Sequence, residues 1–341
     1  MTFGIDKENT MKTIYIILIA LTLGCGALED DPAMYDLPSG EGLTTCVFQD
    51  KLFVFGGVYN NAYMEYPGGS IFSSENGKDW ELVSSPPVYA KDGAMWYPNV
   101  VVYNNKIWYM TGTQVWVSSD AKDWKCVNEF AAFGQRKNYA LFVFNGKMWV
   151  MGGQAYDGLN NEYARASSLI WSSTDGVTWE SWRASVIISY PSIIQYDGKL
   201  YAIGGGSGYT GSPESMSTVY VSTDAVVWTL LAWDTVFTVR MEHAAVCLND
   251  TFFIIGGNTG CYSPGKRYDI WSTAPDDLSN WERISNDIKN IDLWKPLYST
   301  VVYKGYIWIV NGGYYNPDED SDHEYVSNIW RSIDGVNWTN P

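Results

Sequence analysis

The sequence predicts an all-β protein, a β-propeller of six blades with four antiparallel strands in each blade, and two recurring fragments carry this prediction. The first is an apolar run that ends in glycine, as in Leu200-Tyr-Ala-Ile-Gly-Gly205, and its fifth residue falls at positions 56, 111, 152, 204, 256 and 311. The second is a polar turn that ends in tryptophan, as in Ser172-Ser-Thr-Asp-Gly-Val-Thr-Trp179, and its tryptophans stand at 80, 124, 179, 228, 281 and 338. These six positions, four of which are glycine, are separated by 55, 41, 52, 52 and 55 residues, and a period near fifty with four strand-like runs is typical of propeller blades.

Each unit follows the same order, and residues 244–281 illustrate it. Residues 244–248 form an apolar first strand, and the polar pair 249–250 predicts a tight turn. The second strand ends in the glycine pair, and a loop of variable length follows. The third strand carries an aromatic residue, Trp271, and the fourth strand begins at Trp281 after the polar turn. Pairs such as Asn145-Gly146 at the first turn favour tight hairpins because both residues tolerate positive φ.

The composition agrees with many short strands and argues against one class of partner. The 341 residues include 17 Trp, 25 Tyr and 32 Gly, and the net charge of −16 would repel a phosphate backbone, so we expect no nucleic-acid partner. The tryptophan of each turn has an aromatic companion on the third strand, and we expect both to pack between neighbouring blades rather than stack on sugars. The companions are Phe72, Trp116, Trp171, Tyr220, Trp271 and Trp330.

The glycine-ended strand, the aromatic third strand and the tryptophan together resemble the kelch repeat, and Arg240-Met-Glu-His-Ala-Ala-Val246 is similar to the start of such a repeat. The resemblance covers residues 43–341 and implies a six-bladed kelch-type propeller of the galactose oxidase-like class. The second unit departs from the pattern, with Thr111 for the first glycine and almost no loop after it, so we expect a low rim there. Three residues follow Trp338, which leaves the sixth blade a short outer strand. We expect residues 33–38 to lie against that blade and help close the ring; loss of a seventh blade by truncation is the alternative.

The N-terminus predicts export. Lys12 precedes an apolar run at residues 14–23 that is too short to span a bilayer, and Gly24-Cys25 follows. Residues 21–26 resemble a bacterial lipoprotein lipidation site, although Thr22 replaces the usual Leu. This implies a signal peptide over residues 1–25, a linker over 26–42, and a membrane-anchored periplasmic or cell-surface lipoprotein that contacts the membrane only through a lipid on Cys25; an ordinary signal peptide is the alternative. Disulfides and buried free thiols are both open for the later cysteines, Cys46, Cys126, Cys247 and Cys261.

Loop lengths predict which face of the propeller binds a ligand. In a four-stranded meander, the connections after the second and fourth strands lie on one face, here named the long-loop face because these connections are long and rich in Tyr, Asn, Gly, Ser and Asp. Seven residues near the starts of the first strands, where the strands meet this face, are the candidate ligand-binding residues: Arg136, Tyr139, Arg240, Glu242, His243, Lys295 and Tyr298. A basic, aromatic-lined mouth would bind a carboxylate ligand such as a sialic or uronic acid through charge-assisted hydrogen bonds. The alternative is that Arg136 and Arg240 are buried structural residues that pair with neighbours such as Glu242.

The inventory of reactive residues favours a binding protein over an enzyme. The chain has two histidines, His243 and His323, which excludes sites that need three, and the acidic run 318–324 lacks the glycine and the closing glutamate of a calcium loop. We find no Ser/His/Asp order, phosphate loop or dinucleotide fingerprint. We therefore expect an exported, non-enzymatic binding or scaffold protein, without cofactor or metal, whose long-loop face binds a glycan or a protein partner. The alternative, through similarity to exported kelch propellers, is an enzyme of the sialic acid mutarotase type that acts on an acidic sugar through Arg136, Arg240, Glu242 and His243.

Overall fold

The computed structural model describes residues 43–56, 70–85, 87, 98–156, 163–166, 168–207, 214–233, 235, 237–259, 267–285, 298–311, 314–315, 324–325 and 328–341. All of them belong to one compact unit, Asp36–Pro341, and the account below concerns this unit alone. The other unit, Met1–Tyr35, lies outside the described residues, and so do the expected lipidation site at Cys25 and the expected ring-closing segment 33–38. Among the residues described, no helix is long and apolar enough to span a membrane.

The chain folds into a β-propeller of six blades, each an antiparallel meander, which confirms the fold class predicted from the repeats. Blade 1 contains β1 (Thr44–Phe48), β2 (Lys51–Phe55), β3 (Ile71–Ser74) and β4 (Glu81–Ser84). Blade 2 contains β5 (Asn99–Tyr103), β6 (Lys106–Thr111), β7 (Gln114–Ser118) and β8 (Lys125–Asn128). Blade 3 contains β9 (Arg136–Phe144), β10 (Lys147–Tyr156), β12 (Leu169–Ser173) and β13 (Glu180–Arg183), and β11 (Tyr163–Ala166) pairs with β10.

The remaining blades follow the same order. Blade 4 contains β14 (Ser192–Tyr196), β15 (Lys199–Ile203), β18 (Val219–Ser222) and β19 (Thr229–Ala232). Blade 5 contains β20 (Ala244–Leu248), β21 (Thr251–Ile255), β22 (Ile270–Thr273) and β23 (Glu282–Ser285). Blade 6 contains β24 (Tyr298–Tyr303), β25 (Tyr306–Asn311) and β28 (Asn328–Ser332). Two short hairpins, β16 (Gly206–Ser207) with β17 (Glu214–Ser215) and β26 (Tyr314–Tyr315) with β27 (Glu324–Tyr325), lie between the second and third strands of blades 4 and 6.

Two expected departures from the repeat are confirmed. In blade 2 the second and third strands are joined by Gly112 and Thr113 alone, so this blade has a low rim on the long-loop face. In blade 6 the place of an outer strand is taken by a single bridge between Arg331 and Thr339. That bridge stands where Ser73 pairs with Glu81 in blade 1, so blade 6 has the predicted short outer edge.

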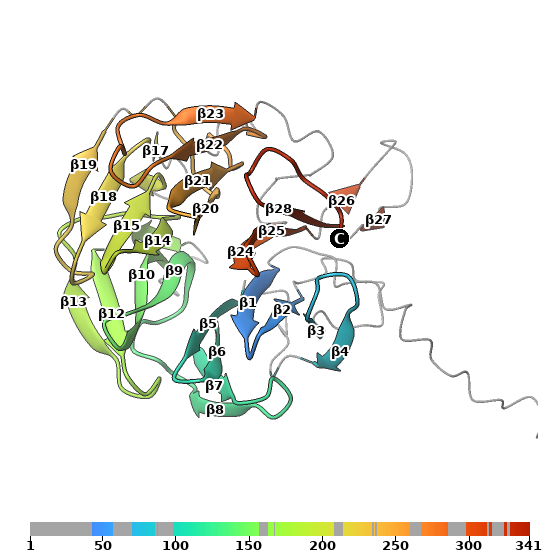
Figure 1. Cartoon of the computed structure of the whole chain (residues 1–341). Helices are drawn as coiled ribbons and strands as arrows, with labels where there is room; N and C mark the ends of the chain where they lie inside the picture. The colour runs from blue at the N-terminus through green and yellow to red at the C-terminus, as the bar shows by residue number, and fades with distance from the viewer. Residues whose placement is uncertain are drawn as a thin grey trace, which may run out of the picture. The chain divides into compact units, whose positions relative to one another are not determined.

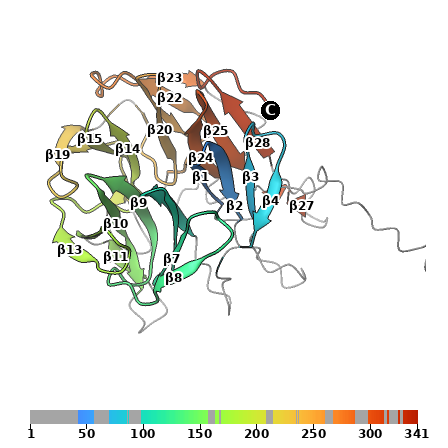
Figure 2. The ribbon, with the colours of Figure 1, turned by 60° about the horizontal axis from the view of Figure 1, so that its bottom comes forward.

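The innermost strands of the blades form a closed ring. They contact one another in the order β1, β5, β9, β14, β20, β24 and back to β1. Figure 1 shows the blades following one another around a circle in chain order, with the red β24 beside the blue β1, and Figure 2 shows the same neighbours from another side. The first residues of these six strands therefore surround the propeller axis.

The hydrophobic core is divided into six clusters, and each cluster lies between two neighbouring blades. One cluster joins Met110 of blade 2 to Trp171 and Trp179 of blade 3, and another joins Ile203 of blade 4 to Trp281 of blade 5. Trp179 is 8% exposed and Trp281 is 4% exposed. An indole enclosed to this extent, as at Trp179, Trp228 and Trp281, has no face left for a sugar. The other three, Trp80, Trp124 and Trp338, are partly buried and pack against their clusters, so the repeated tryptophans are packing residues.

The polar turn recurs because its side chains hold the backbone in one shape. In blade 3 the hydroxyl of Ser173 accepts hydrogen bonds from the amides of Asp175 (3.2 Å) and Gly176 (2.8 Å). The carboxylate of Asp175 accepts two more from the amides of residues 177 and 178, at 2.9 and 2.8 Å. The indole of Trp179 then donates to the carbonyl of Gly176 at 3.0 Å, and the same tryptophan bond closes the turn in all six blades. Four carboxylates in these turns have a lowered pKa, and that of Asp334 falls to about 2 because hydrogen bonds from Asn337 and its neighbours outweigh the opposing effect of burial.

The glycine pair after the second strand of blade 4 lies against the segments that lead into the inner strands of blades 4 and 5. Gly204 has φ of +58°, and a Cβ there would lie 2.7 Å from Cε1 of His243 in blade 5. Gly205 has φ of +91°, and a Cβ there would lie 2.6 Å from the carbonyl oxygen of Ser189 in blade 4. Glycine is thus required both by the left-handed backbone and by the close approach of two entering segments.

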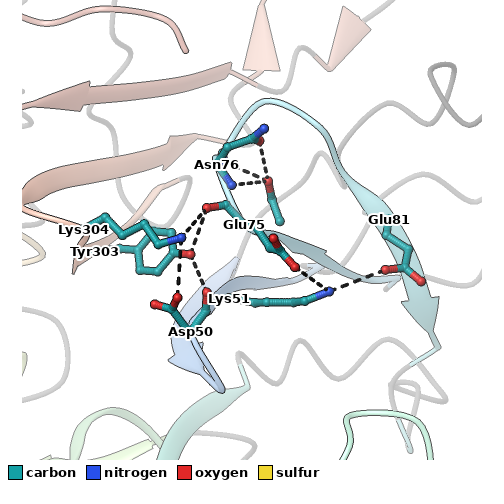
Figure 3. A network of polar contacts seen from close by, with 9 residues as sticks. Asp50, Lys51, Glu75, Asn76, Glu81, Tyr303 and Lys304 are labelled. Atoms are coloured by element: carbon teal, nitrogen blue, oxygen red, sulfur yellow. Dashed lines mark hydrogen bonds and ion pairs between the residues drawn. The ribbon is translucent and has the colours of Figure 1, made fainter.

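Side-chain contacts at the first turns join blade 6 to blade 1 (Figure 3). The hydroxyl of Tyr303 lies 2.6 Å from the carbonyl oxygen of Asp50 and 3.0 Å from that of Glu75. The ammonium of Lys304 donates to the Glu75 carbonyl at 3.0 Å and lies 3.6 Å from the Asp50 carboxylate. Tyr303 is only 4% exposed, so this phenol connects the last blade to the first from a buried position.

Replacing Tyr303 by Phe is expected to lower the free energy of unfolding by about 1–3 kcal/mol, because the two carbonyls at the blade 6–blade 1 boundary share this one phenolic donor and lose it. Tyr196→Phe is the control, since its hydroxyl donates from blade 4 to the side-chain carboxylate of Asp250 at 3.0 Å on the exposed surface. That variant should stay within about 0.5 kcal/mol of the wild type. Denaturant unfolding curves measure both, and equal losses would show that the contact at the ring closure has no special weight.

The three described cysteines are free thiols. Cys46 is buried in β1, and Cys126 and Cys247 are partly buried in β8 and β20. Burial raises the pKa of all three thiols, which keeps them protonated at neutral pH. Cys261 lies outside the described residues, so for the other three the free-thiol alternative holds.

Candidate functional site

A cavity of about 380 Å³ lies on the propeller axis, inside the ring of inner strands. Every blade contributes two to five consecutive residues to its wall, namely 43–45, 98–100, 138–142, 190–193, 242–245 and 299–300. These residues begin the inner strands or directly precede them, so the cavity lies at the end of the axis that meets the long-loop face. A pocket at the shared centre of six blades is the default place for a ligand in such a fold.

Blades 3, 4 and 5 each present a pair of residues at equivalent positions of the cavity wall. The pairs are Asn138-Tyr139, Tyr190-Pro191 and Glu242-His243. The first member of each pair has left-handed backbone geometry, with φ of +60° at Asn138, +54° at Tyr190 and +55° at Glu242. A backbone hydrogen bond of 3.1 Å, from the amide of Tyr190 to the carbonyl of Asn138, joins two of the pairs across the blade 3–blade 4 boundary.

Tyr139 lines the cavity and carries a neutral hydroxyl that is hydrogen-bonded to Asn99. Burial raises the pKa of Tyr139 to about 12, against the smaller lowering effects of a hydrogen bond with Asn99 and of the charge on Arg136. The phenol therefore stays protonated under all ordinary conditions and serves as a hydrogen-bonding group rather than as a base.

Glu242 and His243 follow each other at the start of blade 5. Asn258 follows β21 in the same blade, and its side-chain amide donates a hydrogen bond to Oε2 of Glu242. His243 is 1% exposed, and its ring lies close to the backbone at Gly204 of the preceding blade. The hydroxyl of Ser192 donates to the carbonyl of His243 at 2.7 Å, which joins blade 4 to blade 5 at the cavity wall. Both residues are thus held in place by neighbouring elements.

Arg240 faces away from the cavity wall and is fully enclosed. Its Nε donates to the carbonyl of Thr238 at 3.0 Å, and its terminal nitrogens donate to Thr238 Oγ1 (2.9 Å), Gly256 O (3.0 Å), Asp269 Oδ1 (3.0 Å) and Asp269 Oδ2 (3.2 Å). A guanidinium has five N–H donors, so every donor is used within the protein. Burial by itself would raise the pKa of Asp269, but its bonds to Arg240 and to the Trp271 indole lower it on balance. This is the structural alternative of the sequence analysis, with Asp269 rather than Glu242 as the partner.

Arg136 is also held inside the protein. It is 4% exposed, its Nε donates to the carbonyl of Phe133 at 2.9 Å, and Nη1 donates to the carbonyl of Gly152 at 2.7 Å. Its guanidinium carbon lies 4.1 Å from the centre of the Trp171 ring. Burial lowers the pKa of Arg136 to about 10, so it remains charged at neutral pH.

The structure thus brings together three of the seven predicted site residues, Tyr139, Glu242 and His243, in the cavity wall. Lys295 and the side chain of Tyr298 lie outside the described residues, as do most of the long loops and residues 318–323 of the acidic run. In the described ranges no group of three or more His, Cys, Asp or Glu residues could hold a metal ion. Asn138 and Tyr190 were not among the predicted residues; the available signal was their position, which is equivalent in the repeat to that of the predicted Glu242.

The wall is polar but carries little charge. Among the described lining residues, Glu242 is the only Asp, Glu, Lys or Arg, and the remaining polar groups are hydroxyls, amides and an imidazole. Two of the hydroxyls, Thr45 Oγ1 and Ser299 Oγ, lie 2.8 Å apart across the blade 1–blade 6 boundary. Such a wall offers many neutral hydrogen-bond donors and acceptors to a ligand of matching chemistry.

Fold and site together define a six-bladed β-propeller with a polar axial cavity. No protein-family model matches the sequence, and no curated protein matches it. The kelch resemblance and the lipoprotein type therefore stay predictions. A β-propeller is compatible with a binding or scaffold role, and the particular function has to be argued from the cavity and the surface around it.

Proposed function

We propose that this protein is an exported binding module that holds a glycan unit in the axial cavity and performs no chemistry on it. The observation that carries this proposal is the cavity of about 380 Å³, with hydrogen-bonding groups contributed by all six blades. This volume is at the lower end of the range of about 300–1,000 Å³ that is usual for small-molecule sites. A sugar ring suits such a wall because its hydroxyl groups can exchange hydrogen bonds with Thr, Ser, Asn and Tyr side chains, while Pro98 and Pro191 offer apolar surface.

The acidic-sugar alternative draws no support from the two arginines. All five N–H donors of Arg240 form hydrogen bonds within the protein. The described partners of Arg136 are backbone carbonyls and an aromatic ring. The described wall contains no Lys or Arg side chain that could bind a carboxylate. A neutral sugar is therefore favoured over a sialic or uronic acid.

A protein partner on the long-loop face is the second candidate, because large apolar side chains are exposed on this face. Phe130 (82% exposed), Ile187 (50%), Trp233 (75%) and Val239 (42%) all belong to connections that lead from an outer strand to the next inner strand. These connections lie on the same face as the cavity. Exposed aromatic residues on a rigid frame are typical of protein-binding surfaces.

The location of the protein is also part of the proposal. Export and attachment through a lipid on Cys25 are supported by the apolar run at residues 14–23 and the Gly24-Cys25 pair that follows it. A propeller anchored in this way would present its cavity to glycans outside the cytoplasm.

Thermal-shift measurements with neutral, amine-bearing and acidic monosaccharides test the proposed function. A sugar at about one hundred times its dissociation constant should add about 2.7 kcal/mol to the free energy of unfolding and raise the melting temperature by several degrees. Thr45→Val removes a hydroxyl from the cavity wall and should reduce the shift, whereas Thr229→Val, on the exposed outer strand β19, should not. If no sugar raises the melting temperature, the glycan proposal is wrong and the protein-partner candidate takes its place.

A further inference from the structure

We propose that two copies of this chain associate through the outer edge of blade 4, about a two-fold axis. The contact surface, here named the blade 4 edge, consists of Val227, Leu230, Leu231 and Trp233, which lie in β19 or next to it. β19 lies on the outer rim of the ring of blades (Figure 1 and Figure 2). The inference is independent of glycan binding, because the cavity wall belongs to the inner strands and the residues that lead into them.

The blade 4 edge is apolar and open to solvent. Val227 is 60% exposed, Leu230 45%, Leu231 50% and Trp233 75%. β19 pairs with β18 on one side, and none of the described strands pairs with its other side. A single exposed apolar side chain is ordinary on a protein surface, but four large ones within seven consecutive residues form a patch, and such patches mark interaction surfaces.

The other outer strands show that this composition is particular to blade 4. Each of β4, β8, β13 and β23 carries at least one exposed charged residue, whereas β19 carries none. Charges on a free strand edge are the usual protection against association between sheets. β19 lacks this protection. The charged residues of the other four strands are Glu81, Lys125, Glu180, Arg183, Glu282 and Arg283.

The turn before β19 differs from the other turns in the same way. The residue before the repeated tryptophan is polar in five blades and is Val227 in blade 4. Val227 contributes to the turn through its backbone, whose amide donates to the Asp224 carboxylate at 2.7 Å. Its apolar side chain is therefore not required by the turn. The five polar residues are Asp79, Asp123, Thr178, Asn280 and Asn337.

Side chains rather than a continued hydrogen-bond ladder carry the contact. The register between β18 and β19 shifts by one residue at Leu231, and β4, β8 and β23 have a similar shift. Such an irregularity bends a strand and interrupts its pairing, so β19 presents its leucines better than its backbone. Trp182 of blade 3 is also exposed, but its indole donates to Ser172 at 2.9 Å and Lys147 lies 5.4 Å from the ring.

The charge of the chain indicates that the occupant is a second copy. The net charge of −16 makes two copies repel each other, so they can approach most closely where the edge carries no carboxylate. β19 is the only described outer strand that meets this condition. A two-fold contact would bury the same apolar patch on both copies without bringing charges together. An anionic membrane is disfavoured, because the patch has no Lys or Arg and the acidic chain is repelled.

Sedimentation equilibrium of the full chain over a range of concentrations tests this inference. The average mass of the wild type should rise toward twice that of the monomer. Leu230→Lys should weaken the association at least about tenfold, because an unpaired ammonium would be buried in both halves of the contact. Leu82→Lys is the matched control and should associate like the wild type. Leu82 is 42% exposed and faces Phe72 across the blade 1 sheet, as Leu230 faces Tyr220 in blade 4.

Two further samples make the test independent of one variant. Val227→Asp introduces the residue that blades 1 and 2 carry at this place, so the turn should still form and the association should be lost. Leu230→Lys and Leu230→Glu should each remain monomeric alone and should associate when mixed. Leu230 lies in the middle of the patch, and the central residues of a two-fold contact face their own copies.

Each contrary outcome overturns the inference. A wild type that stays monomeric at every concentration has no such contact, and binding of that monomer to phosphatidylcholine vesicles would make the patch a membrane surface instead. Association that survives both Leu230→Lys and Val227→Asp, or that is lost equally in Leu82→Lys, shows that the blade 4 edge does not carry it. A mixture of the Lys and Glu variants that stays monomeric overturns the two-fold arrangement.

Discussion

Arg240→Met is expected to lower the free energy of unfolding by about 3–5 kcal/mol, because it leaves the buried carboxylate of Asp269 without its cation. Arg240 is fully enclosed, and its guanidinium joins Thr238, the carbonyl of Gly256 and Asp269, which belong to three different segments of blade 5. Methionine fills part of the volume but supplies none of the five donors. The midpoint of denaturant unfolding should therefore move far below that of the wild type.

Two controls separate the orphaned charge from lost packing. Arg136→Met should cost less, about 1–3 kcal/mol, because the described partners of Arg136 are two backbone carbonyls and the Trp171 ring rather than a carboxylate. Arg240→Met combined with Asp269→Asn should recover part of the loss, since the buried charge is then gone. If Arg240→Met instead unfolds like the wild type and loses the response to sugars, Arg240 serves the ligand and not the fold.

The fold could be predicted from the sequence because its main determinants are local and repeated. The polar turn before Trp179 is closed by hydrogen bonds among residues a few positions apart. Similar residues therefore produce the same turn conformation in each blade. The glycine pair marks the end of the second strand in the same way, although its full reason is tertiary: Gly204 is required by the approach of His243 from the next blade. Because the glycine pair recurs along the chain, the sequence predicts the end of the second strand without the contact between Gly204 and His243.

The site could be predicted only in part, because its residues are selected by contacts between blades. Tyr139 and His243 stand at one equivalent position of the repeats, and Glu242 stands between Arg240 and His243; all three lie in the cavity wall. Reading the repeats also placed Arg240 in the site, yet its partner Asp269 stands 29 residues later, directly before β22, and no local pattern reveals that pair. Tyr190 was missed because nothing in a tyrosine indicates a left-handed backbone; that conformation accompanies the hydrogen bond to Asn138 in the neighbouring blade.

Gly176→Ala is expected to be strongly damaging for a single methyl group added to a polar turn, as is the equivalent change at Gly77, where a Cβ would lie 2.0 Å from the ring of Trp308. Gly176 has φ of +72°, and its Cβ would lie 2.2 Å from the ring of Trp108, which is buried in blade 2 and bonded through its indole to the carbonyl of Tyr103. The change should cost about 1–2 kcal/mol for the backbone and about 1–3 kcal/mol more for overpacking against a ring that cannot move freely. Gly198→Ala is the matched control, because it has φ of +66° with no atom within 4 Å and should incur only the first cost.

The position of the neighbouring ring, rather than the turn itself, decides the size of this effect. In blades 2 and 4 the equivalent residues are Ala121 and Ala225, with φ of +62° and +67°, and they share their clusters with Phe53 and Trp149. Alanine is thus accepted where the ring leaves room, whereas at Gly176 an added Cβ would lie 2.2 Å from the ring of Trp108. Trp108→Phe should therefore relieve Gly176→Ala, and the double variant should be more stable than the sum of the single losses predicts, by at least about 1 kcal/mol. Denaturant unfolding of the four proteins in the cycle gives this coupling directly. Strictly additive losses would mean that the left-handed backbone alone, and not the contact with blade 2, requires glycine in this turn.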